Sequence, residues 1–446
     1  MKVQINNLKR NLIFLIVGIL PVVVFAQQPK ISNFRAYDQS GINVFETSKT
    51  DIVPFEGLKV RWGAGFTQQF QNLKHENPDA LNNTGTGANR LYPLDNGFMT
   101  AQANLFMDVQ LADGIKLNVT SYLSARHHNE TWVKGGYIQF DKVPFKGVFW
   151  DDLMKIATVK IGHFEVNYGD QHFRRSDGGQ TLYNAFMDNY IIDEFATEIG
   201  GEVYLQKNGL FGMVGMTNGM IKGAIDSAYV TLVDPNTSRN PSIYFKAGID
   251  KKINENVRVR LSGSLYTNSS NAGSGLTIYG GDRTGSNYQN VMEKGVPGAL
   301  PASTAVAFSG RLNPGFSKKI TATMINTFVK VNGFEFFGTY EGSTGRTKTE
   351  SVDRKATQYA AEGIYRFGKN ESLFLGARYN SATARLAGFV SDVSVNRTSF
   401  AGGWFMTKNV LLKAELVNQK YLDFPTSDYR SSGKFNGYVI EAVVGF

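Results

Sequence analysis

The chain contains no cysteine, which excludes disulfides, thiolate metal ligands, a thiol nucleophile and a lipid-bearing cysteine. Proline is scarce, with 12 residues in a chain of 446, whereas glycine, at 47, is abundant. Beyond residue 25 there is no run of 18 apolar residues, so no segment there predicts a membrane-spanning helix. The formal net charge is +9, but the cations are scattered singly, so we expect no nucleic-acid partner.

The first 26 residues have the composition of an export signal. The first ten carry three cations and no acid, residues 11–25 are almost wholly apolar, and the small residue Ala26 follows. This order predicts a secretory signal peptide over residues 1–26, cut after Ala26. A spanning helix is the alternative, but the apolar core is shorter than the roughly 20 residues required, and Pro21 interrupts it.

Later segments alternate between apolar and polar residues. Within residues 257–265 the apolar set is Val257, Val259, Leu261 and Leu265, and the polar set is Arg258, Arg260, Ser262 and Ser264. Residues 58–69 and 115–126 follow the same scheme. A period of two places the two sets on opposite faces of a sheet. Many of these segments have the length of tilted membrane-spanning strands, which exceeds the roughly 5–6 residues of strands in soluble proteins.

The connections differ sharply in length. Tight turns such as Lys207-Asn208-Gly209 and Asn332-Gly333 alternate with long polar loops. This asymmetry is typical of outer-membrane barrels, which have short periplasmic turns and long outer loops. Residues 144–155 are an exception, because the order of the strands makes them a periplasmic turn although they are long. We expect a short helix there. The predicted fold is therefore all-β, a transmembrane antiparallel β-barrel that follows a cleaved signal peptide.

Sixteen strands are predicted. They lie near residues 57–70, 98–111, 115–127, 131–142, 156–166, 196–206, 209–218, 242–251, 256–267, 319–331, 333–342, 355–367, 371–380, 395–407, 409–421 and 434–446. Residues 303–312 also alternate, but one extra strand would make the total odd and put the two termini on opposite sides. We therefore assign them to an outer loop, with eighteen strands as the alternative.

The last predicted strand, residues 434–446, ends the barrel domain of residues 57–446. Its apolar face holds Tyr438, Ile440, Ala442, Val444 and Phe446. It resembles the C-terminal signature strand of outer-membrane proteins, in which a terminal aromatic residue is read by the assembly machinery. The preceding segment, residues 27–56, is too short for a large plug domain, and we expect a periplasmic tail or a segment within the barrel mouth.

A barrel of this width is too wide for its wall side chains to fill, so a water-filled lumen is expected. The long loop 167–195 follows the fifth strand and mixes cations, acids and aromatic residues. In general porins the loop after the fifth strand narrows the pore, and this segment resembles that loop; an outer cap is the alternative. The candidate pore-lining and constriction residues are Arg174, Arg175, Asp177, Asp188, Arg61, Arg126, Arg258, Arg260 and Arg378.

The segment from Val159 to Gly169 resembles a conserved stretch, G-[RK]-F-x-x-P-F-G, of the phosphate-selective porin O/P family. His163 stands where that family tends to have a cation, and Asn167 stands where it tends to have proline. The resemblance covers this stretch closely and the rest of the mature chain loosely. It implies a Gram-negative, Bacteroidetes-type porin that assembles as a homotrimer. Arg174 and Arg175 are the candidates for binding oxyanions.

No catalytic, metal or cofactor site is predicted, and we do not expect an enzyme. Adjacent His127 and His128 would point to opposite faces of a strand, so they are poorly placed to share a metal ion. The expected function is passive diffusion of small hydrophilic solutes or ions, with a mild preference for anions, through the outer membrane of a Gram-negative bacterium. Outer-membrane lipid and lipopolysaccharide are the expected surroundings. The alternative is a non-conducting structural or assembly barrel that partners a secretion system or a surface lipoprotein.

Overall fold

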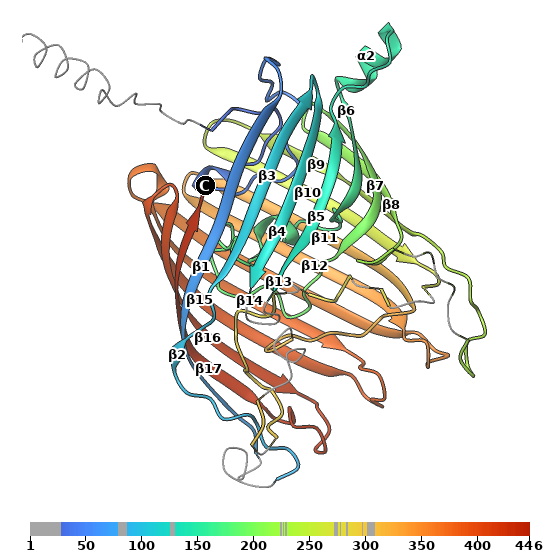
Figure 1. Cartoon of the computed structure of the whole chain (residues 1–446). Helices are drawn as coiled ribbons and strands as arrows, with labels where there is room; N and C mark the ends of the chain where they lie inside the picture. Colours follow the sequence, from blue (N-terminus) through green and yellow to red (C-terminus); the bar gives the residue numbers. More distant parts are fainter. Residues whose placement is uncertain are drawn as a thin grey trace, which may run out of the picture. The chain divides into compact units, whose positions relative to one another are not determined.

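Antiparallel strands follow one another along the chain and hydrogen-bond into one sheet that closes on itself (Figure 1). The computed structural model describes residues 28–446 apart from 79–86, 125–129, 224, 226, 228–229, 272–274, 277, 282–283, 297 and 301–307. Residues 31–446 form one unit. The predicted signal peptide, Arg126, His127 and His128 lie outside the described residues.

The strand bounds follow the predicted segments closely. The strands are β1 (Lys59–Glu76), β2 (Gly97–Phe98), β3 (Gln102–Ala112), β4 (Ile115–Ser124), β5 (Glu130–Phe140), β6 (Ala157–Glu165), β7 (Thr197–Lys207), β8 (Leu210–Thr217), β9 (Ser242–Lys252), β10 (Val257–Asn268), β11 (Lys319–Val331), β12 (Phe334–Arg346), β13 (Arg354–Phe367), β14 (Leu373–Ala384), β15 (Val393–Thr407), β16 (Val410–Leu422) and β17 (Lys434–Gly445).

The ring is closed by β1, which pairs with both ends of the strand series. Its first half, from Lys59 to Thr67, pairs with β3, and its second half, from Gly65 to Glu76, pairs with β17. The two-residue β2 pairs only with Phe70 and Gln71, which lie in the second half of β1. The other sixteen strands form the wall. A closed ring leaves no unpaired strand edge, which is the condition for crossing a membrane with strands.

The sixteen predicted strands are confirmed. Residues 303–312 are predicted to lie outside the wall, and the described part of that range, 308–312, lies in no strand. The expected short helix is α2 (Val148–Met154), between β5 and β6. Asn208, Gly209 and Asn332 have positive φ angles, as their tight turns require. Among the described residues, no helix is both long and apolar enough to cross a membrane.

The two faces of the wall have the opposite polarity to those of a soluble protein. Along β16, Lys413, Glu415 and Gln419 are buried, whereas Leu412 and Leu416 are exposed. The predicted apolar face of the last strand is likewise exposed at Tyr438, Ile440 and Phe446. Because burying charges and exposing leucines would destabilise a protein in water, the outer face is matched to hydrocarbon. The chain is therefore a membrane-spanning β-barrel.

The middle of β16 provides a test of this orientation. Leu416 is 61% exposed at the centre of the strand. We expect Leu416→Arg to lower the free energy of unfolding by about 2–4 kcal/mol in phospholipid vesicles, because arginine is costly at the bilayer midplane. Urea titration in vesicles measures this. Val390→Arg, in the exposed loop between β14 and β15, is the control and should change stability little; an equal loss in both variants would contradict the orientation.

Candidate functional site

The loop between β6 and β7, residues 166–196, lies inside the barrel. None of its residues is exposed. Wall side chains from different parts of the ring bind it: Asn104 of β3 accepts from the amide of Gly179 at 2.8 Å, and Lys413 of β16 donates to three of its carbonyls at 2.9–3.1 Å. We call residues 166–196 the lumenal loop.

Asp170 anchors the first part of the lumenal loop to the wall. Arg260 of β10 donates two hydrogen bonds to its carboxylate, at 2.7 and 2.8 Å, and Lys246 of β9 lies 2.7 Å away. Ser262 donates a further bond at 2.7 Å. Burial opposes ionisation of Asp170, but Lys246 and Arg260 outweigh it, so the pKa of Asp170 lies well below its ordinary value. The group is a buried carboxylate that stays ionised.

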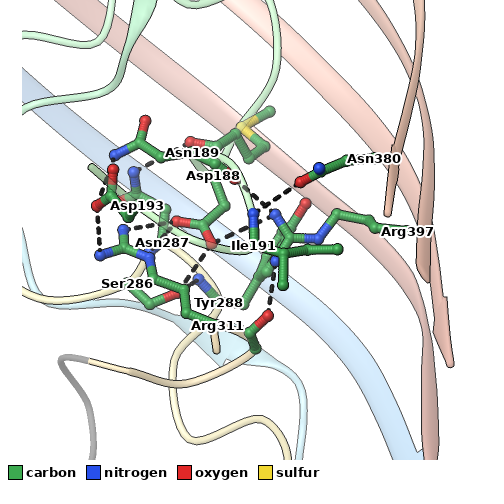
Figure 2. Close-up of polar contacts among 12 residues, drawn as sticks. Asp188, Asn189, Ile191, Asp193, Ser286, Asn287, Tyr288, Arg311, Asn380 and Arg397 are labelled. Carbon is green, nitrogen blue, oxygen red and sulfur yellow. Dashed lines mark hydrogen bonds and ion pairs between the residues drawn. The ribbon is translucent and has the colours of Figure 1, made fainter. Parts of the chain in front are cut away.

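Asp188 anchors the second part, and Figure 2 shows the polar contacts around it. Arg311, from the long connection between β10 and β11, donates to its carboxylate at 2.9 Å and lies 2.9 Å from Asp193. Ser286 and the amide of Asn287 bind the same carboxylate at 3.2 Å. Burial opposes ionisation of Asp188, but the nearby arginines outweigh it and lower its pKa. The β10–β11 connection therefore packs onto the lumenal loop.

The N-terminal segment, residues 31–50, contacts both the wall and the lumenal loop, where Arg35 donates to the carbonyl of Phe173 at 2.7 Å. Its Glu46 lies 3.0 Å from Lys246 and 2.8 Å from Arg260, so it shares both cations with Asp170. Lys116 of β4 donates to the carbonyls of Ser32 and Asn33 at 2.9 Å. These contacts hold residues 31–50 against the inner face of the wall. The amide of Gln39 donates to the carbonyl of Lys408, in the β15–β16 turn, at 2.8 Å, so the segment lies at the end of the lumen that carries the short turns.

Tyrosine hydroxyls bind most of the buried carboxylates of the wall. Each hydroxyl donates a hydrogen bond to a carboxylate, which accepts it without needing a cation. The pairs are Tyr168 and Tyr279 with Glu341, Tyr190 with Glu362, Tyr244 with Glu202, Tyr266 with Glu198, and Tyr288 with Glu415. Several of these tyrosines belong to the internal loops, so the pairs also fasten the loops to the wall.

A cavity of about 320 Å³ remains between the N-terminal segment, the lumenal loop and the wall from β3 to β7. Its volume is at the lower end of that of small-molecule pockets. The ionisable residues that line it are Arg35, Lys116, Lys134, Lys160, Arg175, His163, His172, Glu46, Asp108, Glu165 and Asp177. The site is therefore small, lined by many ionisable side chains as well as apolar ones, and bounded on two sides by chain inside the lumen.

The candidate residues from the sequence have different locations. Arg175 and Asp177 line the cavity, but Arg175 is bound by Asp193 at 2.7 Å and Asp177 by Lys134. Arg174 lies away from it, held by Glu362 at 3.3 Å and by Asn43.

The remaining candidates belong to the wall or to the contacts already described. Arg61 stacks on Phe34, Arg258 pairs with Asp250, and Arg378 pairs with Glu362. Arg260 and Asp188 bind the lumenal loop to its surroundings. Arg126 is outside the described residues. Most of these charges therefore hold chain segments in place.

Sequence reasoning missed Lys134, Lys160 and Glu165. Lys160 could have been found, because it alternates with the exposed Ile161 along β6. Glu165 ends the strand, and period-two reasoning fails where a strand turns into a loop. Among the described residues there is no cluster that could hold a metal ion. That the chain is not an enzyme stays a prediction.

The Asp170 anchor predicts a pH-dependent stability difference. Asp170→Asn leaves two buried cations short of a partner, so we expect unfolding to become easier by about 3–5 kcal/mol at pH 7. Because the pKa of Asp170 is lowered on folding, this contribution is present above the unfolded value, about 3.9, and is lost as the pH falls further. Urea titrations of both proteins should show the gap narrowing below about pH 4.

The control for this experiment is Asp392→Asn, which breaks an exposed 2.8 Å ion pair with Arg385. Exposed pairs contribute little, so its effect should stay below about 1 kcal/mol. A similar loss in both variants, or a gap that widens on acidification, would refute the assignment of Asp170 as a buried ionised anchor.

Comparison with known proteins identifies the fold. No protein-family model and no curated protein matches this sequence. The anion-selective porin from Comamonas acidovorans superposes with a TM-score of 0.50 at 9% identity, over 87% of this chain and 100% of that one. The outer-membrane channel DcaP of Acinetobacter baumannii has a TM-score of 0.48 at 10% identity, over 89% and 99%.

The trimer form of OmpT, an outer-membrane protein of Vibrio cholerae, has a TM-score of 0.48 at 10% identity, over 88% of this chain and 100% of that one. At 9% identity, the likeness to the Comamonas acidovorans structure concerns the fold. Membrane-spanning barrels of this size with an apolar outer band belong to bacterial outer membranes. The chain is thus an outer-membrane β-barrel of a Gram-negative bacterium, with the fold of a porin.

Proposed function

We propose that this barrel is a porin through which small hydrophilic solutes diffuse passively. The observation that supports it is the lumenal loop, which is held across the interior by buried charges and leaves a cavity with many charged side chains beside β3–β7. A loop that narrows the lumen without displacing all polar space is the arrangement of a size-selective channel. The cavity of about 320 Å³ is large enough for a small solute.

The proposal includes a mild preference for anions. The cations that line the cavity are Arg35, Lys116, Lys134, Lys160 and Arg175, against the acids Glu46, Asp108, Glu165 and Asp177. This small excess of cations supports a weak preference and argues against a strong one. The resemblance to the phosphate-selective porin O/P family stays a prediction. Arg174 and Arg175, the candidates for binding oxyanions, are bound by carboxylates of the protein itself, which argues against a phosphate site at these two residues.

A homotrimer embedded in outer-membrane lipid and lipopolysaccharide is part of the same proposal. The outer wall over β7–β11 has an apolar hollow where Gly212, Ala247 and Gly263 replace bulky side chains. A neighbouring wall could pack closely there. Three equal conductance steps per insertion would support this assembly.

The second candidate is a non-conducting barrel that serves in assembly or secretion. The observation that favours it is the amount of chain inside the lumen, where the N-terminal segment, the lumenal loop and the β10–β11 connection are all bound to the wall or to one another. Chain segments packed inside the lumen lower the conductance of a pore. A structural role would tolerate a complete seal, whereas a porin requires that the cavity connect the two ends.

Planar-bilayer recording distinguishes the two candidates. We expect stepwise conductance well below that of an open sixteen-stranded pore, because two segments narrow the lumen. Deleting residues 31–50 should raise the conductance severalfold, since it removes the chain next to the cavity. The control deletion, residues 387–391 in the exposed loop between β14 and β15, should leave it unchanged. Correctly inserted protein that is silent both with and without residues 31–50 would favour the non-conducting barrel.

A further inference from the structure

Most charges that line the cavity already have protein partners that use their hydrogen-bonding capacity. Lys116 donates to two carbonyls of the N-terminal segment and lies 3.3 Å from Asp141. Lys134 donates to Asp177. Such groups contribute little to the recognition of a passing solute, because their donors and acceptors are occupied. Two residues of β6, Lys160 and Glu165, differ from them.

The Lys160 ammonium group retains donors that face the cavity. Within the described residues its one ion-pair partner is Glu202, at 3.4 Å, and the ammonium group donates no hydrogen bond to any of these residues. The carboxylate of Glu202 instead accepts bonds from Tyr204, Tyr244 and the amide of Asn167, at 2.5 to 2.9 Å. The ammonium group also lies over the rings of Tyr137 and Phe164. Its N–H donors remain available to a ligand.

The Glu165 carboxylate retains acceptors. Neither of its oxygens accepts a hydrogen bond from the described residues; Oε1 is fully buried, whereas a quarter of the side chain as a whole is accessible and lines the cavity. The nearest cation, Lys134, is 3.9 Å from Oε2, and Nδ1 of His172 is 3.9 Å from Oε1. Burial holds the pKa of His172 well below its ordinary value, so that imidazole is neutral. A partly buried carboxylate without hydrogen-bond donors is costly, and a ligand in the cavity that donates to Oε2 would reduce the cost.

We propose that Lys160 and Glu165 form a recognition site for small zwitterions of the α-amino acid class. The ligand carboxylate would accept from Lys160 and its ammonium group would donate to Glu165, while Tyr137 and Phe173 contact the apolar part. This inference rests on the proposed porin function. A simple anion or cation would satisfy one of the two residues and leave the other uncompensated, whereas a zwitterion satisfies both without adding net charge to a buried site.

The test compares two isomers, alanine and lactamide, by the swelling of liposomes that contain the intact protein. The two solutes have the same size and differ in charge distribution, alanine being zwitterionic and lactamide neutral. We expect alanine to enter faster through the wild-type protein, after subtraction of protein-free liposomes. In the double variant Lys160→Met, Glu165→Gln the alanine-to-lactamide ratio should fall by about threefold to tenfold, since two charge-assisted hydrogen bonds are lost.

A matched control removes an equivalent pair elsewhere. Lys142 and Asp113 form an exposed ion pair of 2.6 Å at the short-turn end, outside the cavity lining. The variant Lys142→Met, Asp113→Asn should leave the ratio unchanged. Lys160→Arg keeps the charge and should retain the preference, and it covers the case in which Lys160→Met fails to fold, judged by circular dichroism.

The single variants give a second readout in planar bilayers. Reversal potentials in a salt gradient should shift toward cations for Lys160→Met and toward anions for Glu165→Gln. Swelling with both isomers at equal rates, or a ratio that survives the double variant, would overturn the zwitterion site while leaving the porin proposal intact. No swelling with either solute would instead remove the porin proposal on which the site depends.

Discussion

The structure depends on one constraint, which is that hydrocarbon offers no hydrogen bonds to a polypeptide backbone. A sheet can satisfy it only by closing, and β1 closes this one by pairing with β3 along one half and β17 along the other. Closure fixes which face of each strand meets lipid. The charged side chains of strands such as β16 are then forced inward, which is why Lys413 and Glu415 are among the most buried residues of the chain.

Closing sixteen strands also creates a lumen that wall side chains cannot fill. In this protein much of that space is taken by the chain itself. The price is the burial of irregular backbone and of many ionised groups, and it is offset locally. Arg260 and Lys246 bind Asp170, and Arg311 binds Asp188. Tyrosine hydroxyls donate hydrogen bonds to the wall glutamates. Because Glu46 shares its cations with Asp170, the N-terminal segment and the lumenal loop are held by one ion network.

This pairing changes how the charges of the lumen should be interpreted. A cation that faces the interior is a candidate for solute recognition only if its donors are free, and Arg174, Arg258 and Arg378 are occupied by carboxylates of the protein. The same holds for Arg175, although it lines the cavity. Recognition is therefore expected at the few residues whose partners are incomplete, and β6 supplies two of them. Net charge alone would not have identified them.

The sequence by itself determined the barrel. The alternation and the tight turns are local properties of the sequence, as in residues 257–265 and in the turn Asn208-Gly209, whose residues have positive φ angles. The number and order of the strands, and the face of the wall on which each side chain lies, could therefore be predicted. It also indicated that the loop after the fifth strand is unusual. Only the tertiary structure decided that residues 31–50 lie in the lumen and that Arg174 is a structural cation, whereas Lys160 and Glu165 are available to a solute. These outcomes depend on contacts between residues far apart in the chain, made by irregular segments that carry no periodic signal in the sequence.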